Sequence, residues 1–186
     1  MLLTLDNTRY TEKPDRAEFA RLMNRMKRTE PREVDKRGFL EHIAAGKSFI
    51  GGAFSNGVET LDSWQIAALD FDNETEEEDE NGEKVKRFLR PGEEGFISPF
   101  DALERCESLG IAPMAVYKTF NCSTENPRFR LVFDIGESTN DAAIAQAVMM
   151  TLQDLFPEAD ERCKNPNRIY CGTDKAVWAV CEAWFI

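Results

Sequence analysis

Two aspartates, Asp70 and Asp72, stand one residue apart at the end of the apolar stretch "QIAALDFDN". Residues two apart along a β-strand point to the same face of the sheet, so these two carboxylates would project together. Carboxylate oxygens are the hard ligands that Mg²⁺ and Mn²⁺ prefer. The pair therefore indicates a site for a divalent metal ion. An acidic pair that only ends a strand and faces solvent is the alternative.

Basic residues stand where two other predicted strands begin. Arg128 and Arg130 flank Phe129, and Arg168 follows a third acid, Asp160, by eight positions. Guanidinium groups bind phosphate oxygens through paired hydrogen bonds. Three carboxylates and three guanidinium groups, if the fold brings them together, could bind a divalent metal ion together with the phosphates of a nucleotide.

The hydrophobic pattern predicts the elements that would position these residues. The expected strands are 64–71, 114–119, 129–135 and 168–171, and the expected helices are 98–109 and 139–156. This β-α-β-β-α-β order is that of the split βαβ, or ferredoxin-like, arrangement, in which the fourth strand lies beside the first. Both helices would cover one face of the sheet. The acids and arginines would then share the other face, which is expected to be open.

The remaining segments suggest a second, smaller unit and an insertion. Helices are expected at 14–27 and 35–45, a strand at 47–54, and a last strand in "AVWAV", residues 176–180. We therefore predict an α+β protein with a small N-terminal α/β unit at 1–63 and a catalytic unit at 64–186. Residues 73–95 form a charged insertion, which is expected to be mobile because it is rich in acids and poor in apolar residues.

Composition narrows the class of protein. The chain has 186 residues and a net charge of −11, which argues against a simple nucleic-acid coat. Arg9–Arg37, however, holds ten bases and six acids, so the acidic total conceals a basic region. The five cysteines are scattered and odd in number, which favours a reducing cytoplasm over a disulfide framework. The sequence shows no signal peptide and no apolar run that would span a membrane.

Three stretches of the sequence resemble a known family. "AALDFDN", "VYKTFNCSTENPRFRLVF" and "DERCKNPNRIYCGT" are similar to motifs of the archaeo-eukaryotic primase superfamily. The closest resemblance is to primase-polymerase-like domains of phage and mobile-element replication proteins, and it covers about residues 38–174. It implies an RRM-like catalytic unit with a small α/β unit. It also implies a nucleotidyltransferase that copies a DNA template from nucleoside triphosphates with two metal ions.

The resemblance also implies roles for individual residues. Asp70, Asp72 and Asp160 match the acids that bind Mg²⁺ or Mn²⁺ and carry catalysis, and Arg128, Arg130 and Arg168 match phosphate-binding positions. The expected partners are nucleoside triphosphates and a single-stranded or primed DNA template, with a replicative helicase as a further candidate. One position departs from the family pattern. Cys122, between Asn121 and Ser123, stands where the family has a phosphate-contacting histidine.

Other functions fit the sequence less well. A catalytically inactive nucleotide- or nucleic-acid-binding remnant of the same fold is the main alternative, because of Cys122. An aspartyl phosphatase begins with the same acidic pair but has Thr or Val where Glu74 stands, and an EF-hand loop needs glycine where Thr75 stands. A rolling-circle nickase of the two-histidine type is excluded, since His42 is the only histidine. His42 is expected on the surface of its helix.

Overall fold

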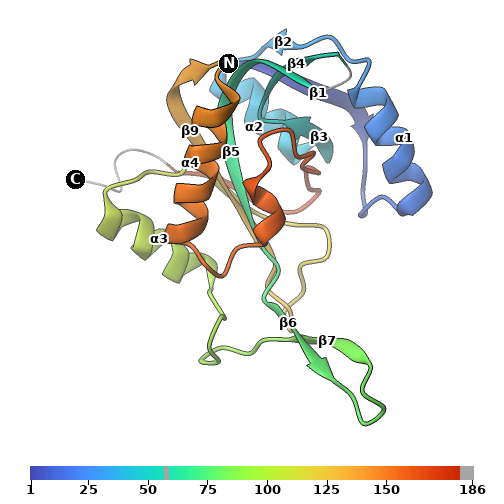
Figure 1. The fold of residues 1–186 in the computed structure, drawn as a ribbon, viewed down its shortest axis with the longest axis vertical. Helices are drawn as coiled ribbons and strands as arrows, with labels where there is room; N and C mark the ends of the chain where they lie inside the picture. The colour runs from blue at the N-terminus through green and yellow to red at the C-terminus, as the bar shows by residue number, and fades with distance from the viewer. Residues whose placement is uncertain (57–58, 181–186) are drawn as a thin grey trace.

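The computed structural model describes residues 1–56 and 59–180, and they form an α+β protein (Figure 1). Its main sheet has five antiparallel strands in the order β10-β8-β9-β5-β4. These strands are β4 (Gly52–Ser55), β5 (Thr60–Phe71), β8 (Ala115–Lys118), β9 (Phe129–Thr139) and β10 (Val177–Ala179). The predicted strand order around β5, β9 and β8 is thus present, and the expected last strand is β10.

Two helices belong to this unit, α3 (Pro99–Leu109) and α4 (Ala142–Leu155). Helix α3 begins with a capping box between Ser98 and Asp101 and ends at Gly110, whose φ of +67° closes the helix in the left-handed conformation. Figure 1 shows α4 lying across β5. Phe71 stacks on Phe129, with ring centroids 4.5 Å apart, and the edge of Phe156 meets Phe71 just after α4. Phe71 therefore faces the helices, as its alternation with the aspartates predicted.

A second, three-stranded sheet lies at the N-terminal end of the chain. Its order is β2-β1-β3, with β1 (Leu2–Arg9), β2 (Arg32–Glu33) and β3 (Lys47–Ile50). Helices α1 (Arg16–Met26) and α2 (Lys36–Ala44) connect its strands, and the side chains of Asp15 and Asp35 cap their N-termini. Sequence analysis had predicted both helices but not β1. Leu3 of β1, Phe39 of α2 and Phe49 of β3 belong to the same hydrophobic cluster as the buried residues of the main sheet.

The expected fourth strand of the split βαβ arrangement, 168–171, is not a strand of the main sheet. Tyr170 makes only an isolated antiparallel bridge to Phe49 of β3, and β4 takes the place beside β5 instead. Strand β4 directly precedes β5 in the chain, so their pairing closes a much shorter loop. Gly51 and Gly52 also lie so close to the backbone of β5 that a Cβ atom at either would clash. No larger residue would permit this approach.

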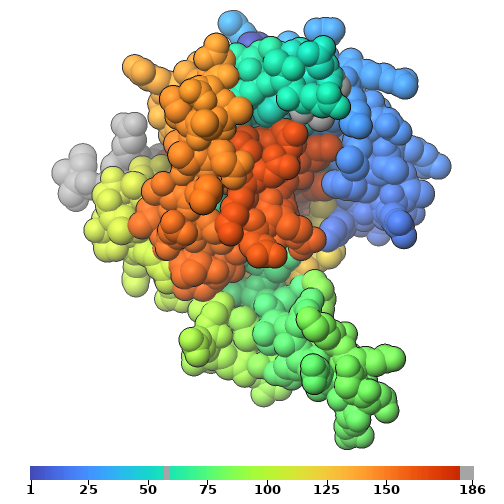
Figure 2. All heavy atoms as spheres, in the orientation of Figure 1, coloured from blue at the N-terminus to red at the C-terminus, as the bar shows by residue number. Residues whose placement is uncertain are grey.

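The charged insertion contains a hairpin, which sequence analysis did not predict. Strands β6 (Glu74–Glu78) and β7 (Lys84–Phe88) pair antiparallel. Glu76 and Glu78 of β6 lie opposite Lys86 and Lys84 of β7. Diagonal ion pairs join Lys86 to Glu74 at 2.9 Å and Arg87 to Glu77 at 2.6 Å. These cross-strand pairs stabilise strands that have few apolar residues. Figures 1 and 2 show the hairpin projecting from the body of the protein.

None of the helices in the described part of the chain is both long and apolar enough to cross a membrane.

Candidate functional site

The first predicted aspartate is part of a buried ion pair between the two central strands. Asp70 of β5 lies directly opposite Arg130 of β9 in the sheet register, and its Oδ1 accepts a hydrogen bond from Arg130 Nε at 2.5 Å. The two residues are only 7% and 6% exposed. The guanidinium of Arg130 also donates to the Cys171 carbonyl at 2.6 Å and to the Tyr117 hydroxyl. Arg130 therefore orients the carboxylate of Asp70 and is itself held in place.

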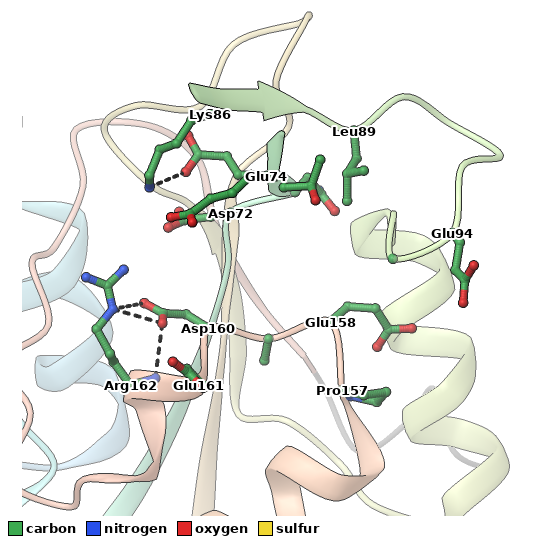
Figure 3. Close-up of a pocket in the computed structure, with 15 residues that line it drawn as sticks. Asp72, Glu74, Lys86, Leu89, Glu94, Pro157, Glu158, Asp160, Glu161 and Arg162 are labelled. Carbon is green, nitrogen blue, oxygen red and sulfur yellow. Dashed lines mark hydrogen bonds and ion pairs between the residues drawn. The ribbon is translucent and has the colours of Figure 1, made fainter. Parts of the chain in front are cut away.

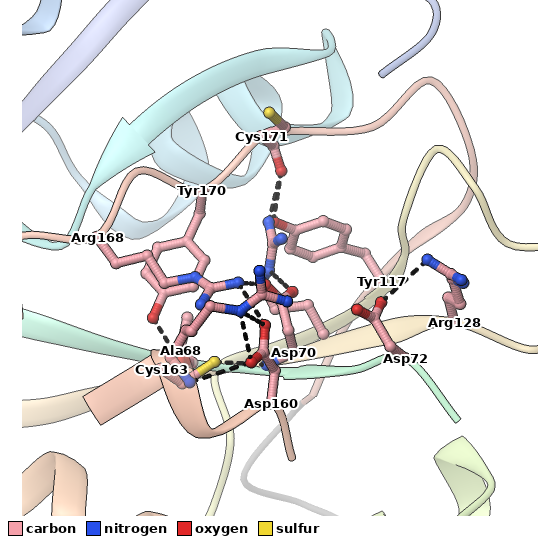
Figure 4. A network of polar contacts seen from close by, with 12 residues as sticks. Ala68, Asp70, Asp72, Tyr117, Arg128, Asp160, Cys163, Arg168, Tyr170 and Cys171 are labelled. Carbon is pink, nitrogen blue, oxygen red and sulfur yellow. Dashed lines mark hydrogen bonds and ion pairs between the residues drawn. The ribbon is translucent and has the colours of Figure 1, made fainter. Parts of the chain in front are cut away.

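Arg168 connects this pair to the third predicted acid (Figure 4). Its Nη2 donates to Asp70 Oδ2 at 2.9 Å and to Asp160 Oδ2 at 3.0 Å. The backbone amide of Asp160 also donates to the Asp70 carbonyl at 2.8 Å. Residues about 90 positions apart in the sequence thus meet at the end of β5, as the topology predicted.

The face that carries these residues is covered, although sequence analysis predicted that it would be open. The segment after the short 3₁₀ helix η1 (Glu161–Lys164) crosses it, and the Tyr170 hydroxyl donates to the Ala68 carbonyl at 2.7 Å. The rings of Tyr117 and Tyr170 lie 5.2 and 4.7 Å from the guanidinium carbon of Arg130. The guanidinium of Arg130 therefore lies between two aromatic side chains, and its pair with Asp70 is shielded from solvent.

Burial and charge pairing determine the protonation of this network. Desolvation is the largest single effect on the pKa of Arg130 and lowers it, but the charge of Asp70, its hydrogen bond and the neighbouring Tyr117 and Cys171 together raise it by more. The pKa of Arg130 therefore stands well above its ordinary value. Burial is the largest single effect on the pKa of Asp160 and raises it, but the hydrogen bonds from Arg162 and the charge and hydrogen bond of Arg168 together lower it by more, and the net shift is downward. Burial also raises the pKa of Tyr170 well above its usual range. At neutral pH Arg130 and Asp160 are thus charged, and Tyr170 is neutral.

The second aspartate lies outside this buried network. The side chain of Asp72 is 34% exposed, and its Oδ1 is 3.4 Å from Arg128 Nη1. The guanidinium of Arg128 also contacts Glu74, the first residue of β6. Arg128 is buried, so it too lies on a covered surface. No described residue donates a hydrogen bond to Oδ2 of Asp72, so this oxygen is available to a ligand.

A cavity of about 490 Å³ opens between the base of the hairpin and the turn before η1 (Figure 3). Asp72 and Glu74 lie on its hairpin side, and Asp160, Glu161 and Arg162 lie on the opposite side. Its charged lining residues are Asp72, Glu74, Glu76, Lys86, Glu94, Glu158, Asp160, Glu161 and Arg162. Acids outnumber bases in this lining, so the cavity favours positive charge.

The predicted ligands suit a divalent cation in chemical kind, because all three are carboxylates. Arg168 Nη2 lies within 3.0 Å of both Asp70 and Asp160, so the point between these two acids already accommodates a positive charge. Within residues 1–56 and 59–180, no three His, Cys, Asp or Glu side chains are arranged as a ready metal-binding group. A metal ion ligated by Asp70 would therefore compete with Arg168 for the same carboxylate oxygen.

The loop around Cys122 follows β8 and lies at a different part of the site. Cys122 is partly buried, while Asn121 and Ser123 are exposed. The Nζ of Lys175 donates to the carbonyls of Phe120 and Cys122, at 2.6 Å each. The structure thus brings a positive charge to this loop, which the sequence did not reveal. Among the described residues, no hydrogen bond or ion pair links this loop to the three acids of the site. The loop residues are Asn121, Cys122 and Ser123, and the acids are Asp70, Asp72 and Asp160.

Asn73 is a site residue that sequence analysis missed. Its φ of +47° turns the chain from β5 into the hairpin, and its side chain donates to the carbonyls of Ile97 and Pro127 at 3.0 and 2.6 Å. Its own carbonyl accepts from Leu89 at the hairpin's return. Hydrogen bonds of Asn73 therefore fix the point at which the chain leaves β5 and enters the hairpin, next to Asp72. Asparagine tolerates the left-handed conformation better than most residues, and this was an available signal.

Arg105 of α3 was also missed. Its guanidinium donates to both carboxylate oxygens of Glu158, at 2.7 and 2.8 Å, and to the Leu155 carbonyl. This contact holds the turn that leads from α4 to Asp160. The two residues lie 53 positions apart, so nothing in the local pattern indicated that they would meet.

His42 is buried, so the expectation of a surface residue on α2 is wrong. Its Nε2 lies 3.0 Å from the Ser48 carbonyl, which can only accept, so this nitrogen carries the proton. Nδ1 faces Arg32 at 3.5 Å. Burial lowers the pKa of His42, and the positive charges of Arg32 and Lys47 add to this effect. His42 is therefore a structural residue that is neutral when the protein is folded.

We expect the free energy of unfolding to fall as the pH drops through about 6.5, the ordinary pKa of histidine. The pKa of His42 is lower in the folded chain, so the unfolded chain binds the proton first and acid favours unfolding. Urea denaturation at about one pH unit above and below that value measures the change. His42→Gln keeps a donor for Ser48 and should lessen the pH dependence. An unaltered dependence in this variant would contradict the assignment.

No family model, no curated protein and no solved structure matches this chain.

Proposed function

We propose that this chain is a primase-polymerase-type nucleotidyltransferase domain, which synthesises DNA or a primer from nucleoside triphosphates during replication of a phage or mobile element. One observation carries this proposal: Asp70, Asp160 and Arg168 converge at the end of β5, with Asp72 next to them at the mouth of an acidic cavity. The β8-β9-β5 strand order and helices α3 and α4 support an RRM-like description of the catalytic unit. In that description, the hairpin is an insertion into the first βα connection.

The side chains of the site divide into two groups. Asp72 and Asp160 line the cavity, where carboxylates can bind a divalent cation together with Asp70. Mg²⁺ or Mn²⁺ bound there would act as a Lewis acid on phosphoryl oxygens. Arg168 is partly exposed and can exchange a carboxylate for a phosphate group of the nucleotide. Arg128 and Arg130 are buried, so we assign them to positioning Asp72 and Asp70.

A second candidate function is non-catalytic binding of nucleotides or nucleic acid. It is favoured by the specific observation that both carboxylate oxygens of Asp70 already contact guanidinium groups. An ion pair of this kind neutralises the acid without a metal ion. The replacement of the family's histidine by Cys122 points the same way only for the side chains of the loop, since Asn121 and Ser123 supply no charge, whereas Lys175 brings one to the loop's carbonyls.

Nucleotide-incorporation assays on primed and unprimed templates, with Mg²⁺ and with Mn²⁺, separate these two candidates. Extension of a primer or synthesis of a new one supports the polymerase. Nucleotide or template binding without incorporation under all four conditions would favour the binding function and overturn the enzymatic proposal.

The N-terminal unit offers a surface for the template phosphates. Seven exposed bases there form no ion pair with any described residue: Arg9, Lys13, Arg16, Lys27, Arg28, Arg32 and Lys36. Ile169 and Cys171, on either side of Tyr170, pack against buried residues of α1. The basic surface is therefore next to the segment that carries Arg168.

We expect the double variant Arg16→Gln, Lys27→Gln to bind single-stranded DNA more weakly and with a shallower salt dependence. Each lost phosphate contact should reduce the slope of log K against log salt by about 0.7. Fluorescence anisotropy over a salt series measures both quantities. The charge-conserving variant Arg16→Lys, Lys27→Arg should behave as the wild type. Equal slopes in all three proteins would exclude this surface from template binding.

A further inference from the structure

The last residue of the hairpin is an exposed aromatic residue that has no role in the proposed function described above. Phe88 is the last residue of β7 and is 48% exposed. Its backbone position is well defined, because Phe88 lies opposite Glu74 in the hairpin register and the next residue, Leu89, donates its amide to the Asn73 carbonyl at 2.8 Å. Leu89 itself is buried. The ring of Phe88 is therefore presented to solvent from a fixed backbone.

The surroundings distinguish this phenylalanine from an ordinary exposed apolar residue. It lines a hollow of about 700 Å³ together with Arg87, Arg90, Glu93 and Glu125. This hollow is separate from the acidic cavity, since none of its lining residues is shared with that cavity. An aromatic ring flanked by guanidinium groups is the combination that binds the faces of unpaired bases and the phosphates between them.

The ring is also connected to the candidate site. The guanidinium carbon of Arg128 lies 5.8 Å from the centre of the Phe88 ring, and the same guanidinium contacts Asp72 and Glu74. Arg128 thus lies between Phe88 and Asp72, whose carboxylate faces the acidic cavity. A base held on this ring would be adjacent to the reacting groups without occupying their cavity.

Charge pairing leaves one cation of the hollow available. Arg87 is neutralised, because it contacts Glu77 at 2.6 Å and Glu93 at 2.8 Å. The guanidinium of Arg90 is exposed and forms no hydrogen bond or ion pair with a described residue, and its charge contributes only weakly to lowering the pKa of Glu93. Arg90 can therefore bind a phosphate group while the ring of Phe88 receives the neighbouring base.

We propose that Phe88 and Arg90 form a stacking platform for an unpaired base of single-stranded nucleic acid at the base of the hairpin. The inference rests on the proposed function and identifies where the template strand would bind. Single-stranded nucleic acid is the favoured occupant, because in a duplex the faces of the bases are already stacked on each other and cannot reach an exposed ring. A mixed, nearly neutral hollow suits a base better than it suits a run of phosphates.

The test uses fluorescein-labelled oligodeoxythymidylate of about twelve nucleotides, a length within the range that single-stranded binding folds cover. We expect Phe88→Ala to bind it about tenfold more weakly by fluorescence anisotropy, and Phe88→Tyr to bind it as the wild type does. Phe100→Ala is the matched control, because Phe100 is 78% exposed at the start of α3, away from the hollow. Arg90→Gln should weaken binding and reduce the salt slope by about 0.7.

An abasic oligonucleotide of equal length separates stacking from charge. Wild type should bind it about as weakly as Phe88→Ala binds the thymidylate, and Phe88→Ala should lose little further affinity. The platform is overturned if Phe88→Ala binds thymidylate as tightly as the wild type, or if wild type binds no oligonucleotide. Nucleotide incorporation, measured in parallel on the same proteins, judges the proposed function separately, since wild type can extend a primer even if Phe88→Ala binds thymidylate as tightly as it does.

Discussion

Replacing Asp70 with Asn will lower the free energy of unfolding by about 3 kcal/mol. The reason is that Arg130 is buried against Asp70 and would keep its charge without the carboxylate that neutralises it. Removing one member of a buried ion pair costs more than the pair itself contributes. Urea denaturation monitored by circular dichroism measures the loss.

Two further variants make this prediction specific. Asp154→Asn removes an exposed carboxylate from α4 and should change stability by less than about 0.5 kcal/mol. Asp70→Leu combined with Arg130→Met removes both charges and should recover much of the stability that Asp70→Asn loses. If Asp70→Asn is as stable as Asp154→Asn, Asp70 and Arg130 do not form a buried pair in solution.

Replacing Asp72 with Asn will reduce nucleotide incorporation at least about a hundredfold while leaving the fold stable. Asp72 faces the cavity with one third of its side chain exposed, and its contact with Arg128 is long, at 3.4 Å. Its carboxylate is thus available to a metal ion and contributes little to folding. The unfolding free energy should stay within about 0.5 kcal/mol of wild type.

The difference in expected stability between Asp70→Asn and Asp72→Asn decides which variant is the clearer test of the proposed enzymatic activity. A loss of activity in Asp70→Asn would be ambiguous, because that variant is also expected to be unstable. Asp72→Asn avoids this ambiguity, and Asp154→Asn serves as the control for the loss of one negative charge. Incorporation at the wild-type rate in Asp72→Asn, under either metal ion, would remove the metal hypothesis for this position.

Local patterns in the sequence were sufficient to predict several elements. The hydrophobic pattern predicted a helix at 98–109, close to the limits of α3, and the placing of Asp70 and Asp72 on one face predicted that Phe71 between them faces the helices. The hairpin in the insertion was not predicted, because it is stabilised by pairs such as Lys86 with Glu74, which stand on two different strands. A high density of charge in the linear sequence predicts disorder instead. Strand β1 was missed for a related reason, since its pairing partners β2 and β3 lie in other segments.

The sequence by itself thus determined that Asp70 and Arg130 each lie on the face of their strand opposite Phe71 and Phe129, because the period of two along a strand is a local property. Only the tertiary structure decided that this face is covered by the segment that carries Tyr170, and that Asp70 and Arg130 form a buried pair while Asp72 faces a cavity. The reason is physical: alternation specifies which side chains point together, whereas burial depends on which distant segment packs over them. That packing is set by contacts such as Arg168 with Asp70, between residues 98 positions apart.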